Sequence, residues 1–396
     1  MTPAFRTPLL PLLLALLGLC CTAPLPAQDD GTLRIGTWNL EHFGQRHSPP
    51  RTEADIVRLA AAIRDLDVSV LAVQEISGPD ALEELASKIG KDWEFVLGTT
   101  GGWTDGKSRQ SIGFLYDASR VELLHAEELL AFPRRLEDVP IFHRIPVTAC
   151  FRDKRTGFDF RCVTVHFKAS RGAVNEQKRR LEATTLHDWL QGLQKQRGED
   201  PDMVVLGDFN STYGTNVQKQ LERGSVTKYL RQVRPEPTIM HFDDPIDQIA
   251  VSPGLTEVLK ETFDSHSEGM SKDEPDRTRW RHSYSDHFAV TVGMSASKDE
   301  DPKASFSRGP KSQWLASSAN QTADATAKPP TTNRDEQWFP AGSMVTIFHT
   351  PPSRTTGLSI KGELLAPLDG HWVYLRDASG AVHAYPMMNI ERITLQ

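Results

Sequence analysis

The chain has 396 residues, of which 38% are hydrophobic and 24% are charged, and its formal net charge is −7. This composition favours a soluble globular protein over a disordered or membrane-embedded one. The acidic balance argues against a protein that holds nucleic acid tightly over a broad basic surface, although it leaves room for a nuclease with a local basic rim.

The N-terminus has the layout of a secretory signal peptide. Arg6 supplies a positive charge, residues 9–19 form an apolar run, and Ala27 is a suitable last residue before cleavage. The run is too short to cross a bilayer as a helix. We therefore expect residues 1–27 to be removed and the protein to be secreted or periplasmic. A lipoprotein anchored through Cys20 or Cys21 is the weaker alternative, because leucine is a poor residue before a lipidated cysteine.

Residues 33–293 show alternating strand and helix patterns. In chain order, we expect strand 33–39, a helix that Thr52 caps, strand 68–75, helix 79–89, strands 111–116 and 121–125, hairpin strands 145–151 and 158–167, helix 174–194, and strands 202–206, 247–251 and 287–292. Strands 68–75 and 202–206 have almost no polar interruption, which is typical of strands buried on both faces.

The composition changes after Gly293. Residues 295–334 are rich in Ser, Ala, Lys, Asp, Thr and Pro, which indicates a flexible linker. Alternating apolar residues return between 337 and 396, with turn signals at 368–370 and 378–380, so this end is expected to form a small β-rich module.

Removal of the signal peptide would leave two cysteines, Cys150 and Cys162. The hairpin centred near residues 155 and 156 would place them almost opposite one another, and an oxidising compartment would allow a disulfide. The alternative is a pair of small buried thiols.

Polar residues interrupt the expected strands at their ends. Asn39, Glu75, His166 and the 208–210 segment stand at the carboxyl ends of four strands, whereas Asp247 and the 286–287 segment stand at the starts of two others. If those two strands run antiparallel to their neighbours, all six groups meet at one edge, where active sites of layered α/β proteins commonly lie.

The types of these residues indicate a metal site with oxygen ligands. Glu75, Asp208, Asp286 and Asn39 are hard oxygen donors, and neither a cysteine nor a closely spaced histidine pair joins them. Such a set favours Mg²⁺, Mn²⁺ or Ca²⁺ over Zn²⁺. Each position taken singly is more often a turn or a solvated strand end, so the prediction depends on their occurring together and in order.

Four short segments resemble the ordered motifs of the endonuclease/exonuclease/phosphatase superfamily. They are Thr37-Trp38-Asn39-Leu40, Gln74-Glu75, Gly207-Asp208-Phe209-Asn210 and Ser285-Asp286-His287. The resemblance covers residues 33–293, and it implies an α/β fold, a two-sheet sandwich with outer helices, to which the C-terminal β module would be added. It also implies a hydrolase that acts on phosphate ester bonds.

The resemblance further implies a metal-and-water centre. Glu75 would be the principal ligand of Mg²⁺ or Mn²⁺, with Asn39 in support and Asp286 beside the metal or behind the neighbouring histidine. Asp208 would orient or deprotonate the attacking water. Asn210 would bind the reacting phosphate and position Asp208.

The remaining implied roles concern the phosphate. Asp247 would pair with His287, which would contact the phosphate or assist the leaving group, and His166 would be a second phosphate-facing histidine. Arg144 resembles a substrate-contacting arginine. The chain departs from the nuclease pattern in offering Gln110 where a glutamate often orients the second histidine, so His166 should be less cationic.

A basic rim near the strand ends favours a nucleic acid as the substrate. Arg109, Arg144, Lys168 and Arg171 could neutralise phosphates locally, whereas residues 178–180 could equally be a solvated helix start. We therefore expect an exported, monomeric, metal-dependent phosphodiesterase, most simply an endonuclease on DNA or RNA, whose C-terminal module binds an unidentified partner. The alternatives are a phosphomonoesterase or lipid phosphodiesterase, similar to inositol phosphatases or sphingomyelinases, and a non-catalytic binding or scaffold protein.

Overall fold

The computed structural model describes residues 32–321 apart from 45–50, 102–109, 137, 232–235, 268–275, 297–298, 300 and 302–303. It also describes the backbone of five strands between residues 344 and 395. The expected signal peptide and its cysteines, the end of the expected linker, and Arg109 lie outside the described residues. None of the described helices is long and apolar enough to cross a membrane.

Two six-stranded mixed sheets form the first domain. One sheet has the order β13 (Val258–Ser265), β14 (Val290–Ser295), β1 (Thr32–Phe43), β2 (Val70–Ile76), β4 (Ser111–Asp117) and β3 (Trp93–Leu97). The other has the order β11 (Lys228–Tyr229), β12 (Asp247–Val251), β10 (Met203–Asp208), β9 (Asp159–His166), β8 (Val147–Asp153) and β5 (Val121–Glu128). A short hairpin joins β6 (Arg135–Leu136) to β7 (Val139–Pro140).

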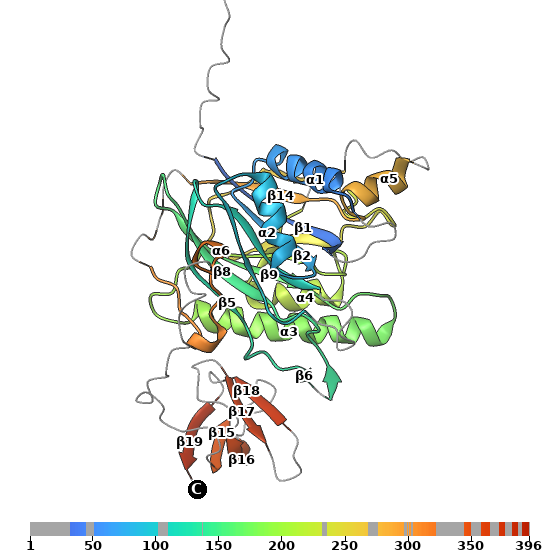
Figure 1. Cartoon of the computed structure of the whole chain (residues 1–396). Helices are drawn as coiled ribbons and strands as arrows, with labels where there is room; N and C mark the ends of the chain where they lie inside the picture. The colour runs from blue at the N-terminus through green and yellow to red at the C-terminus, as the bar shows by residue number, and fades with distance from the viewer. Residues whose placement is uncertain are drawn as a thin grey trace, which may run out of the picture. The chain divides into compact units, whose positions relative to one another are not determined.

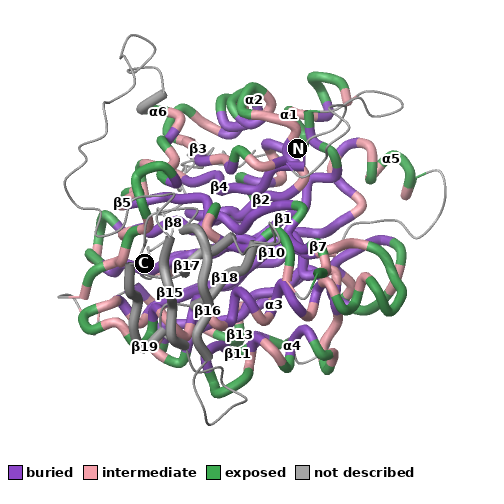
Figure 2. Tube along the Cα trace, turned by 90° about the horizontal axis from the view of Figure 1, so that it is seen from below, coloured by how far each residue is buried: buried purple, intermediate pink, exposed green. Residues whose placement is uncertain are grey.

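Three hydrophobic clusters account for this layering. One lies between the sheets and joins residues of β2 and β4 to residues of β9 and β10. The second packs α3 (Ala173–Gln194) and α4 (Asn216–Leu221) on the outer face of one sheet, and the third packs α1 (Glu53–Asp65) and α2 (Pro79–Ile89) on the other (Figure 1). Both sheets are thus covered on two faces, which explains the uninterrupted apolar strands and their burial (Figure 2).

The helix ends follow the expected chemistry. Thr52 accepts a hydrogen bond from the Asp55 backbone, and the Asp55 side chain accepts one from the Thr52 backbone, so a capping box starts α1. Pro79 starts α2, and Gly90 follows its last residue. Leu59 and Ile63 of α1 are buried, whereas Val57 is 44% exposed. The shorter elements are α5 (Asp276–Ser283), α6 (Ser318–Gln321) and 3₁₀ turns at Arg223–Ser225 and Lys311–Gln313.

The residues after the first domain are not a free linker throughout. The Ser305 backbone exchanges hydrogen bonds with Gly198 and Asp200, and Ser307 accepts a hydrogen bond from the buried Arg161. The Gly309 backbone donates to Glu127 at 2.7 Å. Residues 304–318, which lie within the stretch 295–334 that was predicted as a flexible linker, thus make defined contacts with the first domain. Polar and backbone contacts fix this stretch, and a scarcity of large apolar residues does not reveal such contacts.

Within residues 337–396, where a β-rich module was expected, the structure has a five-stranded antiparallel sheet. Its order is β18 (Val382–Pro386), β17 (Trp372–Arg376), β16 (Leu358–Leu364), β15 (Met344–His349) and β19 (Ile390–Leu395).

The expected disulfide is wrong. Cys150 and Cys162 are both free and buried. In the β8–β9 hairpin, Cys150 is opposite Arg161, and Cys162 is opposite Ala149. The two cysteines are thus one residue out of register, and because side chains alternate along a strand, they lie on opposite faces of the sheet.

Candidate active site

The strand registers bring the predicted residues to one edge of the two sheets. Asn39 pairs with Gln74 in the parallel β1–β2 ladder, and Asp208 pairs with His166 in the parallel β10–β9 ladder. Strand β12 runs antiparallel to β10 and places Asp247 opposite Asp208. Strand β14 runs antiparallel to β1, so the segment before it returns to the same edge. The antiparallel arrangement on which the sequence argument depended is confirmed.

Asn39 is the centre of the first contact group. Its Nδ2 donates to Asp208 Oδ2 at 3.1 Å and to Glu75 Oε1 at 3.3 Å. Its Oδ1 accepts the Glu41 backbone N–H at 3.0 Å. His166 Nε2 lies 3.3 Å from Asp208 Oδ2 and 3.8 Å from Glu75 Oε1. The Asn39 amide therefore holds two carboxylates beside one histidine.

A strand irregularity directs Glu75 into the site. The β1–β2 register shifts after Asn39, and Glu75 has a left-handed φ of 62°. A bulge of this kind changes the direction of one side chain and is common beside active sites. The His42 backbone N–H donates to Glu75 Oε2 at 3.1 Å, and His42 Nδ1 lies 3.3 Å from the same oxygen. Sequence reasoning missed His42, although it follows Asn39 by only three positions.

The Gly207-Asp208-Phe209-Asn210 segment leaves β10 with a specific geometry. Gly207 has φ 146°, and a Cβ there would lie 2.1 Å from the Val165 carbonyl oxygen, so only glycine fits. The Asn210 backbone donates to Asp208 Oδ1 at 2.8 Å, and Asn210 has a left-handed φ of 48°. The Asn210 side chain donates to the Phe167 carbonyl at 3.2 Å. Asn210 thus positions Asp208, as expected.

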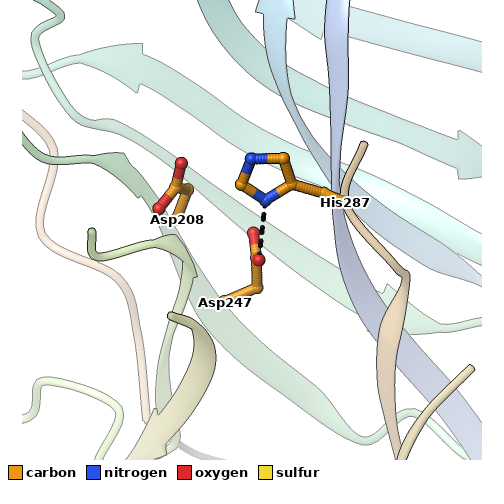
Figure 3. A group of neighbouring side chains, drawn as sticks. All are labelled: Asp208, Asp247 and His287. Atoms are coloured by element: carbon orange, nitrogen blue, oxygen red, sulfur yellow. Dashed lines mark hydrogen bonds and ion pairs between the residues drawn. The ribbon is translucent and has the colours of Figure 1, made fainter. Parts of the chain in front are cut away.

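The second contact group is an aspartate–histidine pair. His287 Nδ1 lies 2.8 Å from Asp247 Oδ2, so Nε2 faces the other polar groups (Figure 3). The Ser285 hydroxyl fixes the segment 285–287, because it donates to the Asn39 carbonyl at 2.6 Å and accepts the His287 backbone N–H at 3.0 Å. Trp38 donates to the His287 carbonyl at 2.9 Å. The aspartate fixes the orientation and tautomer of the imidazole.

The electrostatic environment separates the two histidines. Burial, together with the charges of Arg144 and His287, holds the pKa of His166 well below its ordinary value. Burial also opposes ionisation of His287, but the charge and hydrogen bond of Asp247 raise its pKa well above the ordinary value. These shifts favour the neutral form of His166 and the protonated form of His287.

Asp286 lies at the rim of the site. Its Oδ1 is 3.8 Å from His287 Nε2, and its backbone donates to Glu41 Oε2 at 3.1 Å. Arg281 binds Glu41 through Nε at 2.7 Å and lies 3.7 Å from Asp286. Burial raises the pKa of Asp286, and Arg281 partly offsets this. Glu41 was not predicted, and it serves to hold the loop that carries Asp286.

A wholly buried carboxylate positions the predicted substrate-binding residues. Glu182 of α3 is 1% exposed and accepts the backbone N–H groups of Phe142 and Lys168, each at 2.9 Å. Burial raises its pKa to about 7. Sequence reasoning missed Glu182. The sequence did hold one signal of its burial: Glu182 lies four residues before Leu186, on the buried face of α3.

Arg144 lies in the interior of the site. It is buried, burial lowers its pKa, and the charges of Glu75 and Asp208 act in the opposite direction. Gln110 accepts a hydrogen bond from Arg144 and lies 3.2 Å from His42 Nδ1. Gln110, expected beside His166, thus bridges Arg144 and His42.

The rest of the basic rim divides into two kinds of residue. Arg171 is exposed, and its guanidinium lies 5.6 Å from the Phe242 ring centroid. Lys168 is half-buried and donates to the Ala169 carbonyl at 2.9 Å. Arg179 is turned inward and donates to the Lys168 and Ser170 carbonyls at 2.7 and 2.8 Å. Arg179 therefore supports the loop instead of facing a ligand.

The donor set fits a divalent cation. Ligand atoms of Asp208, Asp247 and His287 lie within 4.8 Å of one another, and all three residues are buried (Figure 3). Burial and the charge of Asp247 raise the pKa of Asp208 to about 7, as expected where carboxylates are close together without a neutralising cation. Glu75 is 14% exposed at the opening of the same site. The carboxylate oxygens of Glu75 and Asp208 suit Mg²⁺ or Mn²⁺, whereas a protonated His287 would not be a ligand.

Comparison with known families matches residues 36–287 to the endonuclease/exonuclease/phosphatase family. No curated protein matches the chain. Among solved structures, the endonuclease/exonuclease/phosphatase of Bacteroides vulgatus is similar at 18% identity over 66% of this chain and 98% of that one, with a TM-score of 0.50. Danio rerio TDP2 complexed with a single-strand DNA product has 18% identity, coverages of 67% and 99%, and a TM-score of 0.48. The mannosyl-6-phosphatase of Bacteroides thetaiotaomicron has 18% identity, coverages of 66% and 98%, and a TM-score of 0.47.

Proposed function

The chain belongs to the endonuclease/exonuclease/phosphatase family of phosphoesterases, and from this premise we propose that it is an exported, divalent-metal-dependent phosphodiesterase acting on nucleic acid. The observation that carries the proposal is the convergence of Glu75, Asp208 and the His287–Asp247 pair at one sheet edge. The N-terminal signal pattern supports export.

The side chains divide the hydrolytic work between them. Asp208, held by Asn39 and Asn210, accepts a proton from the attacking water or orients it. His287, kept cationic by Asp247, donates a proton to the leaving oxygen or a hydrogen bond to the phosphate. A divalent cation bound at these carboxylates would supply positive charge that offsets the charge of the phosphate oxygens.

The neutral groups stabilise charge that develops in the transition state. His166 and Asn210 are fixed donors at the same edge, and each well-placed donor contributes a factor of about 10²–10³ in rate. Arg144 is buried close enough to Glu75 and Asp208 to interact with their charges. It therefore presents a preorganised positive group to a phosphate.

The rim favours a nucleic-acid substrate. Arg171 lies over the Phe242 ring, and such a planar cation–aromatic pair is suited to bases and backbone phosphates. Lys168 is fixed beside it through its backbone bond to Glu182. Local neutralisation of this kind suffices for a protein whose overall charge is −7.

One parallel assay tests the proposal. The purified protein lacking residues 1–27, supplied with Mg²⁺ or Mn²⁺, is incubated with plasmid DNA, RNA, an artificial phosphodiester, a phosphomonoester and sphingomyelin, with Asp208→Asn as the control. We expect metal-dependent cleavage of DNA or RNA that is lost in Asp208→Asn. Preference for the phosphomonoester or sphingomyelin would replace the nuclease by the corresponding alternative, and inactivity on every substrate would support a binding role.

A further inference from the structure

A second group of carboxylates lies far from the active site. Asp200 and Asp202 directly precede β10, whereas Asp208 is its last residue. Six residues of strand span about 20 Å. Ligand oxygens of Asp200, Asp202 and Asp301 lie within 4.8 Å of one another. The first two belong to the first domain, and Asp301 belongs to the segment that follows it.

These carboxylates are buried. Asp200 is 1% exposed and Asp202 is 2% exposed. Asp200 Oδ1 accepts the Asp202 backbone N–H at 2.9 Å, but the Asp202 carboxylate has no hydrogen-bond or ion-pair partner in the part of the chain that the structure describes. Its oxygen faces the other two carboxylates. An unpaired buried carboxylate is unfavourable unless it is protonated or a cation compensates its charge.

Among the residues that the structure describes, the nearby Arg152 does not pair with Asp202. Arg152 donates to Asp159 at 2.6 and 2.8 Å and thus binds a neighbouring carboxylate instead. Burial, together with the negative charges of Glu257, Asp301 and Asp299, raises the pKa of Asp202 to about 8. Burial similarly raises the pKa of Asp200 to about 9.

We propose that Asp200, Asp202 and Asp301 form a structural Ca²⁺ site distinct from the catalytic centre. Calcium takes six to eight oxygen ligands in flexible geometry, whereas Mg²⁺ needs a near-ideal octahedron and keeps several waters. A set of carboxylates from two separate segments matches the flexible oxygen coordination of Ca²⁺. An exported protein would meet calcium at the concentrations that extracellular sites require.

The site would fasten the segment after the first domain. The Ser305 backbone already exchanges hydrogen bonds with Gly198 and Asp200, at 3.0 and 2.9 Å. Ser307 and its neighbours cover the buried Arg161–Glu199 ion pair, whose atoms are 2.9 Å apart. A cation shared by Asp202 and Asp301 would join the two sides of this contact.

Thermal unfolding with and without calcium tests the proposal. The full mature protein is treated with a chelator, given excess Mg²⁺ to occupy the catalytic centre, and titrated with Ca²⁺ to about 1 mM, the range of extracellular sites. We expect Tm to rise by about 3 °C at tenfold saturation. Asp202→Asn and Asp301→Asn should lose this rise. In chelator, Asp202→Asn should be at least as stable as the parent, because it removes an unpaired buried charge.

Two variants serve as controls. Glu75→Gln changes a proposed ligand of the catalytic centre, and Asp92→Asn removes an exposed carboxylate that precedes β3, in the sheet that does not contain β10. Both should keep the calcium response. The proposal is overturned if calcium leaves the parent unchanged, if Glu75→Gln abolishes the response, or if Asp301→Asn responds like the parent. Asp301 is only half-buried, so Asp301→Asn should fold. This variant therefore tests the calcium site even if Asp202→Asn fails to fold.

Discussion

Replacement of Asp208 by asparagine separates catalysis from folding. The variant keeps an oxygen that can accept the Asn210 backbone N–H, whose bond to Asp208 is 2.8 Å long. It removes the negative charge that orients or deprotonates water. Loss of such a group lowers kcat by about 10²–10⁴-fold, which corresponds to about 3–5 kcal/mol on the barrier.

The effect on stability has the opposite sign. Burial raises the pKa of Asp208 from 3.8 to about 7, so its ionised form destabilises the metal-free fold by on the order of 4 kcal/mol above that pH. Against this, the amide would lose the 3.1 Å bond from Asn39, a loss of about 1 kcal/mol. In chelator at pH 8, Asp208→Asn should therefore melt no lower than the parent. At pH 4 the advantage should disappear, because the parent carboxylate is then protonated.

The assay pairs kcat on an artificial phosphodiester with Tm at both pH values, and Asp92→Asn is the matched control. Turnover close to that of the parent in a folded Asp208→Asn protein would refute the catalytic role. The compared quantity is the Tm of Asp208→Asn minus the Tm of the parent. If this difference is smaller at pH 8 than at pH 4, the electrostatic reasoning is refuted.

Four further outcomes are expected. Chelation should abolish hydrolysis and Mg²⁺ or Mn²⁺ should restore it; activity in a thoroughly chelated sample would reject the metal requirement. His287→Ala should lower kcat by about 10²-fold or more, and Tm should fall as well because the buried Asp247 carboxylate loses its partner at 2.8 Å; both are measured side by side. Truncation after Gln321 should leave an active enzyme, whereas truncation after Ser297 should lower Tm by uncovering Arg161; equal melting of the two would contradict this. Burial raises the pKa of Glu182 to about 7, so the parent loses stability as pH rises from about 4.5 to 7. In denaturant unfolding, the free energy of unfolding of Glu182→Gln minus that of the parent should therefore be larger at pH 8 than at pH 4 by on the order of 3 kcal/mol. A difference that does not change with pH would argue against a buried ionisation.

The sequence predicted that the polar site residues meet at one edge of the sheets because their meeting depends on where the strands end. His166, Asp208 and Asp247 are terminal residues of their strands, and Asn39 lies four residues before the end of β1; strand periodicity is a local property. The alternating strands and helices followed from the same periodicity, whereas the two-sheet sandwich was implied by the family resemblance.

The roles of several other residues depend on hydrogen-bond partners that are distant in the sequence, and local sequence patterns do not reveal such partners. His42 reaches Glu75 through left-handed backbone at both residues, and Glu182 receives backbone donors from two distant loops. The tail after the first domain looks like a linker by composition, yet Ser307 and Gly309 complete buried charged groups. These roles arise from long-range hydrogen bonds.

The cysteine pair shows where sequence reasoning ends. The pattern correctly predicted the hairpin strands on either side of residues 155 and 156, but the ladder pairs Cys150 with Arg161 instead of Cys162. An error of one residue in register reverses the face to which a side chain points. Local sequence therefore determined which strands and polar ends exist. Only the packing of the two sheets and the turn between β8 and β9 decided the register, because register depends on which faces are buried together.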